Sequence, residues 1–301
     1  MLLDALLELA TQKGIKTVAV AAAEDSEVIE AVSEAIKCNL AKFILFGNEE
    51  RIKQILSEKN AINLENDVPQ IVHVESKEKA AEMAVKAVKK HDADVLMKGN
   101  IPTNILLKEV LNKDYGLRTG SVLSHIAVFE VPEFDRFIIV TDAGMNIAPD
   151  LAQKVQITKN AVSIAHSIGI SNPKVAPIAA VEVINPSMQT TIDAATLTIM
   201  NKRGQISGCT IDGPLGLDNA VSTFAAEHKG IESDVAGNAD ILLVPTIEVG
   251  NALYKSLVYF AKAKVGAIIA GAKSPIVLTS RADSAESKIY SLALALCSVI
   301  K

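Results

Sequence analysis

The chain has 301 residues, of which 49% are apolar and 22% are charged, and its formal net charge at neutral pH is −5. These shares are typical of a globular protein with one or two hydrophobic cores. The negative charge, and the lack of a basic stretch interleaved with aromatic residues, argue against a protein that binds nucleic acid.

The N-terminal segment 1–9 is apolar, but it contains acidic residues and has no basic region before it. This pattern favours an amphipathic helix over a signal peptide. No uncharged apolar run is long enough to cross a bilayer, so we expect a cytoplasmic protein without a membrane partner. The three cysteines are widely spaced and form no CxxC pair, which predicts neither a disulfide framework nor a zinc cluster.

The first hundred residues alternate between short apolar runs and stretches with helical periodicity. The spacing predicts strands over 16–23, 42–46, 70–74 and 94–99, with helices between them. Strands that alternate with helices in this way indicate βαβ units and a parallel sheet.

The predicted strand 94–99 is followed by a polar loop and a helix that begins near Pro102. In open α/β sheets, ligands bind at the carboxyl ends of strands. Lys98, Gly99, Asn100 and Thr103 are therefore candidates for substrate binding, although the same residues also suit an ordinary turn.

Two β-rich segments, 124–131 and 136–141, are separated by only four residues. A connection this short cannot hold a crossover helix, so we expect an antiparallel pair. The interruption of the α/β alternation places the start of a second domain near this point.

The alternation resumes after Pro149-Asp150, where a helix is predicted to reach residue 167. Predicted strands follow over 174–181, 205–211, 239–244 and 265–270, with helices over 187–200, 217–228 and 251–263. The last of these helices would place Lys255 near its start. Polar residues follow most strands, and in a parallel sheet these residues share one edge and line a cleft.

The segment 275–288 combines a short buried strand, a polar loop and a helix-start signal with Asp283 as N-cap and Glu286 three residues on. A hydroxyl and a guanidinium just before a helix N-terminus form a natural anion site. Ser280 and Arg281 are therefore candidates to bind a phosphate-like group. On spacing alone, the capping and turn interpretation of these residues is the stronger one.

Other chemistries have weaker support in the sequence. The five histidines show no paired ligand spacing and none neighbours a cysteine, so we expect no metal site there. Asp142, Asp212 and Asp218 have carboxylates that suit a divalent cation, or that only cap helices and fix turns. No G-x-S-x-G elbow is present, which argues against a serine hydrolase.

Five stretches together carry a resemblance to a known family: 93–99, 141–149, 212–220, 250–255 and 278–284. In this order they resemble the phosphate acetyl/butyryltransferase family, on its butyryl-directed side. The resemblance implies an α/β fold of two domains flanking a cleft, similar to isocitrate and isopropylmalate dehydrogenases. The first domain would comprise 1–124 plus 273–301, and the second 125–272.

The resemblance also implies a reaction: butyryl-CoA and inorganic phosphate would give butyryl phosphate and CoA, reversibly and by direct attack in a ternary complex. Acyl-CoA and phosphate would be the partners, with CoA as a substrate, no permanently bound cofactor, no metal, and a homo-oligomeric assembly. Ser280 and Arg281 would be catalytic. The cleft residues carried over from the motifs are Asp142, Asn146, Asp212, Asn251 and Lys255.

The sequence departs from the acetyl-directed members of the family at one position. Those members have an acidic residue seven positions after the motif serine, where this chain has Ser287. Asp283 and Glu286 are the nearby replacements for a base that accepts the thiol proton, and direct use of the CoA thiolate needs neither.

Three alternatives to butyryl transfer stay open on the sequence. One is phosphate acetyltransferase activity, since a methylene in an apolar pocket contributes only about 1–3 kcal/mol of discrimination. A second is a metal- and NAD-dependent decarboxylating dehydrogenase of similar fold. The third is a protein that binds acyl-CoA or phosphate without catalysis.

Overall fold

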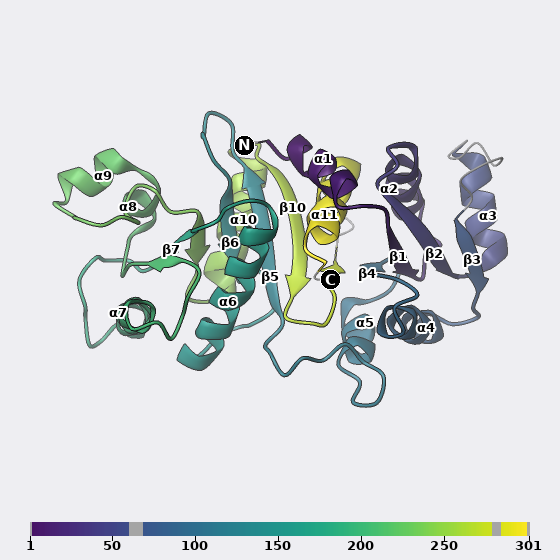
Figure 1. Ribbon diagram of the computed structural model, residues 1–301, viewed down its shortest axis with the longest axis horizontal. Coiled ribbons are helices and arrows are strands. Elements are labelled where there is room, and N and C mark those ends of the chain that lie inside the picture. The colour runs from purple at the N-terminus through teal and green to yellow at the C-terminus, as the bar shows by residue number, and fades with distance from the viewer. Residues whose placement is uncertain (1, 60–68, 279–283, 300–301) are drawn as a thin grey trace. The chain divides into compact units, whose positions relative to one another are not determined.

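The structure, a computed structural model, describes residues 2–59, 69–278 and 284–299 (Figure 1). The chain forms two compact units. We call Leu3–Ser121 with Gly266–Lys301 the terminal unit, and Val122–Val265 the central unit. The sequence-predicted site residues Ser280, Arg281 and Asp283 lie outside the described residues.

The terminal unit is built on strands in the order β3-β2-β1-β4-β11-β10. β1 is parallel to β2 and β4, β3 is parallel to β2, β11 is parallel to β4, and β10 is antiparallel to β11. The parallel strands therefore end at one common edge. Their bounds are β1 (Lys16–Ala21), β2 (Ala41–Gly47), β3 (Gln70–His73), β4 (Val95–Lys98), β10 (Lys264–Ala270) and β11 (Ile276–Val277).

Helices cover both faces of these strands, with α2 on one side and α4 on the other (Figure 1). Their starts follow capping residues in the sequence: Asp25 accepts hydrogen bonds from two N–H groups of α2, and Ser76 accepts one from α4. The helices are α1 (Asp4–Gln12), α2 (Ser26–Lys37), α3 (Glu49–Glu58), α4 (Lys77–Lys89), α5 (Thr103–Val110) and α11 (Ala285–Cys297).

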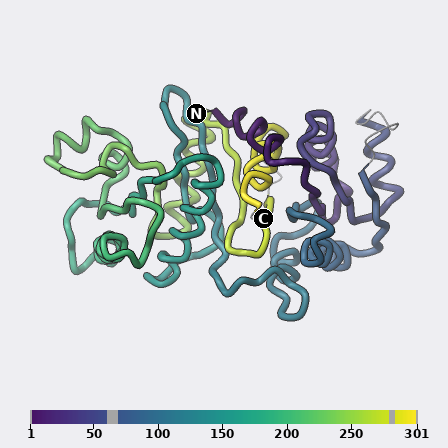
Figure 2. Tube along the Cα trace, viewed as in Figure 1, coloured from purple at the N-terminus to yellow at the C-terminus, as the bar shows by residue number. Residues whose placement is uncertain are grey.

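The last helix, α11, packs against α1 and α2, so the first and last helices of the chain lie side by side (Figure 2). Its residues Tyr290 to Cys297 are almost continuously buried. The predicted N-cap of this helix is wrong: Ser284, not Asp283, caps α11 by accepting the N–H of Ser287. A serine one position later satisfies the same free N–H groups, and Glu286 then falls in the first turn without completing a capping box.

The central unit has strands in the order β5-β6-β9-β7-β8. The expected antiparallel pair is confirmed, with Ile126 of β5 opposite Thr141 of β6. β6, β9, β7 and β8 are parallel to one another, so their following loops share one edge. The bounds are β5 (Ser124–Glu130), β6 (Ile138–Thr141), β7 (Lys174–Pro177), β8 (Thr210–Ile211) and β9 (Ile241–Leu243).

The helices of the central unit begin and end where local side chains fix them. α6 starts with a complete capping box between Asp150 and Gln153. The helix predicted over 217–228 is two helices, because Ser222 is extended and caps the second one. The bounds are α6 (Leu151–Ser167), α7 (Gln189–Lys202), α8 (Leu217–Val221), α9 (Thr223–His228) and α10 (Ile247–Tyr259).

α10 begins four residues earlier than the sequence predicted and takes in Gly250. A Cβ atom on Gly250 would lie 2.6 Å from the carbonyl oxygen of Asp142, so the glycine marks a close helix-to-loop contact rather than a turn. The predicted place of Lys255 near the start of the helix is therefore wrong, since Lys255 is the ninth residue of α10. No helix in the described part of the chain is long and apolar enough to span a bilayer.

Candidate functional site

The loop after β4 in the terminal unit is held by close backbone packing. The N–H of Gly99 donates to the carbonyl of Ala21 at 2.9 Å, and the N–H of Asn100 donates to that of Ala22 at 2.6 Å. A Cβ atom on Gly99 would lie 2.0 Å from the Ala22 oxygen, so only glycine fits. The structure leaves the Lys98 side chain half-buried and Thr103 exposed at the start of α5.

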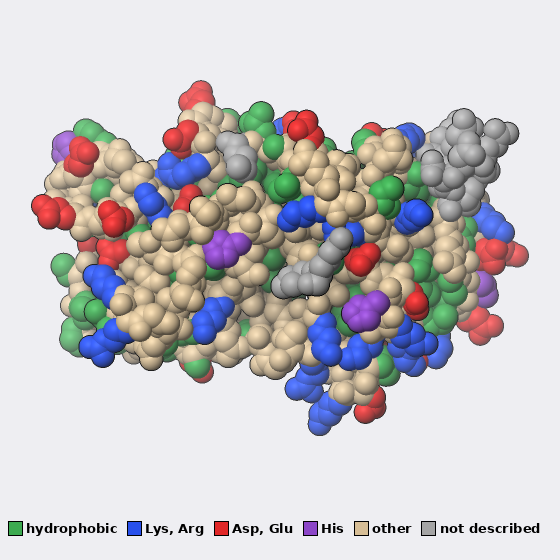
Figure 3. Space-filling model, in the orientation of Figure 1, with side chains coloured by type: hydrophobic (Ala, Val, Ile, Leu, Met, Phe, Trp, Pro, Cys, Tyr) green, Lys and Arg blue, Asp and Glu red, His purple; other side chains and the backbone are tan. Residues whose placement is uncertain are grey.

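Positive charge gathers in this unit even though the chain is acidic overall. Lys and Arg side chains cluster over α4 and α5 on the face that Figure 3 shows. The Lys273 ammonium beside Lys89 lowers the pKa of Lys89, as expected when two like charges lie close together. Such a concentration of charge attracts anionic ligands toward the unit.

The loop after β6 in the central unit is organised by one buried carboxylate. Asp142 is 2% exposed. Its Oδ1 accepts hydrogen bonds from the backbone N–H groups of His125 at 3.2 Å and of Gly144 and Met145 at 2.9 Å each. Its Oδ2 accepts the N–H of Asn146 at 3.1 Å and the Asn146 amide Nδ2 at 2.5 Å. Five donors neutralise this charge, so the carboxylate fixes the shape of the loop.

Asn146 is likewise engaged in holding this loop. Its Nδ2 also donates to the carbonyl of Leu123 at 2.8 Å, which ties the loop to the residue before β5. Asp142 and Asn146, both predicted from the sequence, are therefore brought into direct contact.

The helix α10 lies beside the Asp142 loop and carries two other predicted residues. Asn251 and Lys255 are four positions apart and both are exposed, so they lie on one side of the helix. Between them in the sequence, Tyr254 packs edge-on against His125, with ring centroids 5.9 Å apart.

The sequence interpretation did not find His125 or Tyr254. His125 was set aside because it has no paired metal-ligand spacing, although the β5–β6 register places it next to Asp142. Tyr254 lies inside the stretch 250–255, which resembles the family, and this position is the feature of the sequence that could have identified it as a candidate.

Asp212 lies at the end of a different strand. Its N–H donates to Val175 at 3.2 Å, and β8 is separated from β6 by β9 and β7. Three strand spacings correspond to about 14 Å, which is too far for side-chain contact with Asp142. The sequence thus predicted the shared edge correctly, but the two aspartates occupy separate places along it.

A polar clasp joins the loops after β7 and β8. Lys229 lies 2.5 Å from a Glu182 oxygen and 3.0 Å from an Asp218 oxygen, and the Asn219 amide donates to Glu182 at 2.6 Å. The hydrogen bond from Lys229 is the main cause that lowers the pKa of both carboxyl groups. Asp218 therefore acts as an ion-pair partner.

Glu286, one of the two candidate bases, is exposed in the first turn of α11. The Tyr290 hydroxyl lies within hydrogen-bond distance of two carboxylates, 2.6 Å from Oδ1 of Asp4 and 3.0 Å from Oε1 of Glu286, which share its single proton. Among the described residues, no group of three or more His, Cys, Asp or Glu side chains is arranged to hold a metal ion.

Comparison with known proteins gives a family match over nearly the whole chain. A family model described as phosphate acetyl/butaryl transferase matches residues 1–86 and 68–296. The "Probable phosphate butyryltransferase" of Bacillus subtilis is 58% identical over 94% of this chain and 93% of that protein. A phosphate acetyltransferase of Thermotoga maritima is 50% identical over 98% of each chain.

Solved structures agree with the family match. A branched-chain phosphotransacylase from Enterococcus faecalis V583 superimposes with a TM-score of 0.83 at 38% identity, covering 95% of this chain and 99% of that one.

The expected isocitrate and isopropylmalate dehydrogenase-like fold is wrong. The fold is the α/β fold of the phosphotransacylases. A related dehydrogenase fold is that of 4-hydroxythreonine-4-phosphate dehydrogenase from Klebsiella pneumoniae, with a TM-score of 0.54 at 11% identity over 94% of this chain and 99% of that one. The alternation of strands and helices predicts an open α/β sheet, but it does not fix the order of the strands.

Proposed function

The chain belongs to the phosphate acetyl/butyryltransferase family, and from this premise we propose which residues carry out its reaction. The protein is an acyltransferase, and its reaction is the reversible transfer of a butyryl group between coenzyme A and inorganic phosphate. The observation that carries this function is that the family match spans residues of both units, including every loop described above.

The proposed mechanism is direct transfer in a ternary complex. In the direction of acyl phosphate formation, a phosphate oxygen attacks the thioester carbonyl, the carbon–sulfur bond breaks, and CoA leaves as a thiolate that takes up a proton. Negative charge builds on the carbonyl oxygen in between, so fixed donors are needed both there and at the phosphate. Holding both substrates together supplies proximity without a covalent acyl-enzyme.

We assign the phosphate to Arg281, whose guanidinium can bind it with two parallel hydrogen bonds, and polarisation of the carbonyl to Ser280. Lys98, Gly99, Thr103, Asp212, Asn251 and Lys255 form the proposed substrate-binding set. The hydrogen bonds of Asp142 and Asn146 support a different part for these two residues, namely that they hold the loop against which α10 packs.

The acceptor of the thiol proton is proposed to be Asp283 or Glu286. Glu286 is a candidate because its carboxylate is exposed in the first turn of α11, where it can exchange protons with solvent. Each residue is replaced by its amide, and the pH dependence of kcat/KM is measured in the direction in which CoA thiol attacks the acyl phosphate. A base must be deprotonated to act, so loss of the acidic limb in one variant identifies the acceptor.

Acetyl transfer is the second candidate activity, because the Thermotoga maritima relative named for it is as similar as several butyryl-directed ones. We further propose that the protein is cytoplasmic and homo-oligomeric, and that it binds CoA as a substrate with no resident cofactor. The proposed domains are 1–124 with 273–301, and 125–272.

Release of CoA thiol tests the function. Butyryl-CoA and acetyl-CoA are each supplied with and without inorganic phosphate. Strict phosphate dependence with a higher kcat/KM for butyryl-CoA is expected. A higher kcat/KM for acetyl-CoA would move the protein to the second candidate activity, and no release from either substrate would contradict acyl transfer for these groups.

The role of Arg281 has its own test. Arg281→Ala should raise the KM for phosphate and lower kcat/KM by roughly 10²–10³, the usual effect of losing one such donor. Arg281→Lys should retain only part of the kcat/KM that Arg281→Ala loses, because a lysine cannot form two parallel hydrogen bonds. Near-normal turnover and phosphate affinity in Arg281→Ala would show that the assignment is wrong.

A further inference from the structure

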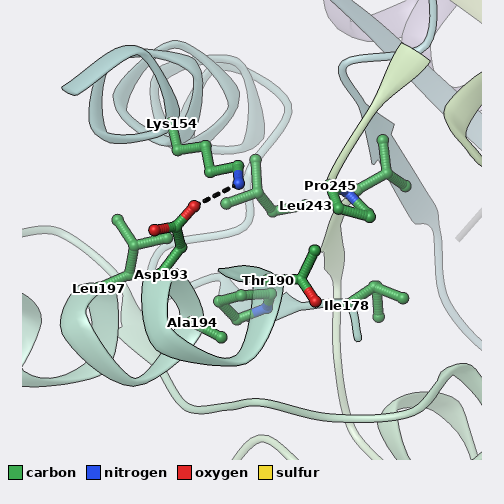
Figure 4. A pocket seen from close by; sticks show the side chains of 10 residues that line it. Lys154, Ile178, Thr190, Asp193, Ala194, Leu197, Leu243 and Pro245 are labelled. Atoms are coloured by element: carbon green, nitrogen blue, oxygen red, sulfur yellow. Dashed lines mark hydrogen bonds and ion pairs between the residues drawn. The ribbon is translucent and has the colours of Figure 1, made fainter. Parts of the chain in front are cut away.

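A small pocket lies in the central unit where β7 and β9 end. One wall is formed by the residues that follow these strands, and the opposite wall by one face of α7 (Figure 4). The side chains are mostly apolar. Among the lining side chains are those of Ile178, Thr190, Ala194, Leu197, Leu243 and Pro245.

One end of the pocket is closed by a buried ion pair. The Nζ atom of Lys154 lies 2.6 Å from Oδ2 of Asp193, and the two side chains are 6% and 8% exposed. Gln189 donates to the other Asp193 oxygen at 2.9 Å. Figure 4 shows this pair on one side of the pocket, with Ile178 and Pro245 on the other. Separating a buried pair leaves an uncompensated charge, so this end forms a rigid stop.

The pocket adjoins the Asp142 loop through Val244, which lines it. The N–H of Val244 donates to the carbonyl of Thr141 at 2.8 Å. The Val244 side chain also packs against Gly250: a Cβ atom on Gly250 would lie 2.9 Å from it. The same Cβ atom would lie 2.6 Å from the carbonyl oxygen of Asp142. A single residue thus separates the pocket from the Asp142 loop.

The loop after β8 reaches the pocket from the other direction. A Cβ atom on Gly213 would lie 3.1 Å from Pro177 and 3.6 Å from Ala194, both of which line the pocket. The pocket is therefore set between the Asp142 and Asp212 loops, on the edge where α/β sheets bind ligands.

We propose that this pocket receives the distal end of the acyl chain, and that its residues set which acyl groups the enzyme transfers. This inference rests on the proposed acyl transfer. Apolar walls suit a hydrocarbon chain, whereas the phosphates of CoA would meet a lysine that is already paired. The cavity volume is about 10 Å³, which is about the space that one water molecule needs and suits a terminal methyl group.

The size of the pocket predicts which acyl chain lengths the enzyme prefers. With the terminal methyl group of a butyryl chain placed in the pocket, an acetyl group, which is two carbons shorter, leaves the pocket unfilled, and a longer chain meets the Lys154–Asp193 stop. One methylene in such a pocket changes kcat/KM by roughly 10-fold or more.

The test is a chain-length profile of kcat/KM with acetyl-, butyryl- and hexanoyl-CoA and saturating phosphate. Ala194→Val narrows the pocket and should lower kcat/KM for butyryl-CoA roughly tenfold, with less than a twofold change for acetyl-CoA. Leu197→Ala removes a lining side chain and enlarges the pocket beside the Lys154–Asp193 pair, so it should raise the hexanoyl-to-butyryl ratio of kcat/KM several-fold. The matched control is Ala161→Val, which makes the same change at a buried position of α6 outside the pocket.

The possible results distinguish a failure of the acyl-pocket inference from a failure of the proposed acyl transfer. Phosphate-dependent release by the unmodified enzyme, with profiles in Ala194→Val and Leu197→Ala that match the control, would overturn the pocket inference alone. No phosphate-dependent release by the unmodified enzyme would overturn the proposed function. If thermal unfolding shows that a variant is not folded, Thr190→Ile at the half-buried rim replaces it, with the same loss for butyryl-CoA expected and an unchanged profile as the contradicting result.

Discussion

The loops after β4 and β6 occupy equivalent places in the two units, yet different forces hold them. The β4 loop rests on Gly99, whose missing side chain lets the backbone hydrogen-bond the end of β1. The β6 loop is tied together by Asp142, whose carboxylate accepts five hydrogen bonds. The first arrangement fixes the loop through its backbone, whereas the second fixes the loop through a buried side-chain carboxylate. A residue in a family motif can therefore be required without touching substrate.

The largest expected effect comes from Asp142→Asn. The amide keeps the size of the side chain but turns donors toward the N–H groups it must accept from, so the free energy of unfolding should fall by roughly 2–4 kcal/mol. Urea unfolding measures this free energy. Asp150→Asn is the control, because asparagine is also a good N-cap and this change should alter the free energy of unfolding by less than about 0.5 kcal/mol. Full stability with lost activity would instead indicate that Asp142 acts on the substrate.

The glycine of the first loop gives the next effect. Gly99→Ala places a methyl group against the backbone of Ala22, which cannot move aside cheaply, so a loss of roughly 2–3 kcal/mol is expected. Gly144→Ala is the matched change in the second loop, where the nearest atom would be 3.4 Å away on the His125 ring, and it should cost under about 1 kcal/mol. Equal losses in thermal unfolding would mean that the two loops are not held differently.

Lys98→Met tests the half-buried lysine at the end of β4, whose Nζ atom lies 3.3 Å from the carbonyl oxygen of Gly99. Stability should change by less than about 0.5 kcal/mol, while the KM for phosphate or for butyryl-CoA should rise roughly tenfold through the loss of one charged donor. Lys108→Met, an exposed lysine on α5, serves as the control. Unchanged kinetics in Lys98→Met would remove Lys98 from the substrate-binding set.

The smallest effect is expected at the clasp between the loops after β7 and β8. Lys229→Met should lower the free energy of unfolding at pH 7 only slightly, because the ion pair is partly exposed and screened by solvent. The Lys229 ammonium lowers the pKa of Glu182 and Asp218, so the contribution is complete at neutral pH and is lost as the pH falls through the lowered pKa values. Unfolding curves of the two proteins should therefore converge at acid pH, and a difference that persists there would argue against an electrostatic contribution.

The sequence predicted most strands and helices because periodicity and capping act locally. The antiparallel β5–β6 pair followed from a four-residue connection, and the start of α6 from the helix-start signal Pro149-Asp150. Sites that depend on distant contacts escaped prediction. A glycine at position 250 of α10 lets the backbone of Asp142 come close, and the N-cap of α11 falls on the second of two suitable residues.

The same limit applies to the site. The point where a strand ends can be predicted from the local sequence. Lys98, Asp142 and Asp212 were therefore all placed correctly at the ends of strands. The partners of a buried carboxylate are not readable in this way, and neither is the Lys154–Asp193 pair, whose members are 39 residues apart and come from different helices. His125 gains its place beside Asp142 through sheet register alone.

The most direct test of the central claim is to follow the phosphorus of the reaction. Butyryl-CoA and inorganic phosphate are incubated with the enzyme, and ³¹P NMR is recorded while released thiol is measured in the same sample. Direct transfer predicts an acyl phosphate resonance that grows in step with free CoA and disappears when excess CoA is added. Release of thiol without any acyl phosphate would show hydrolysis of the thioester and would contradict the account.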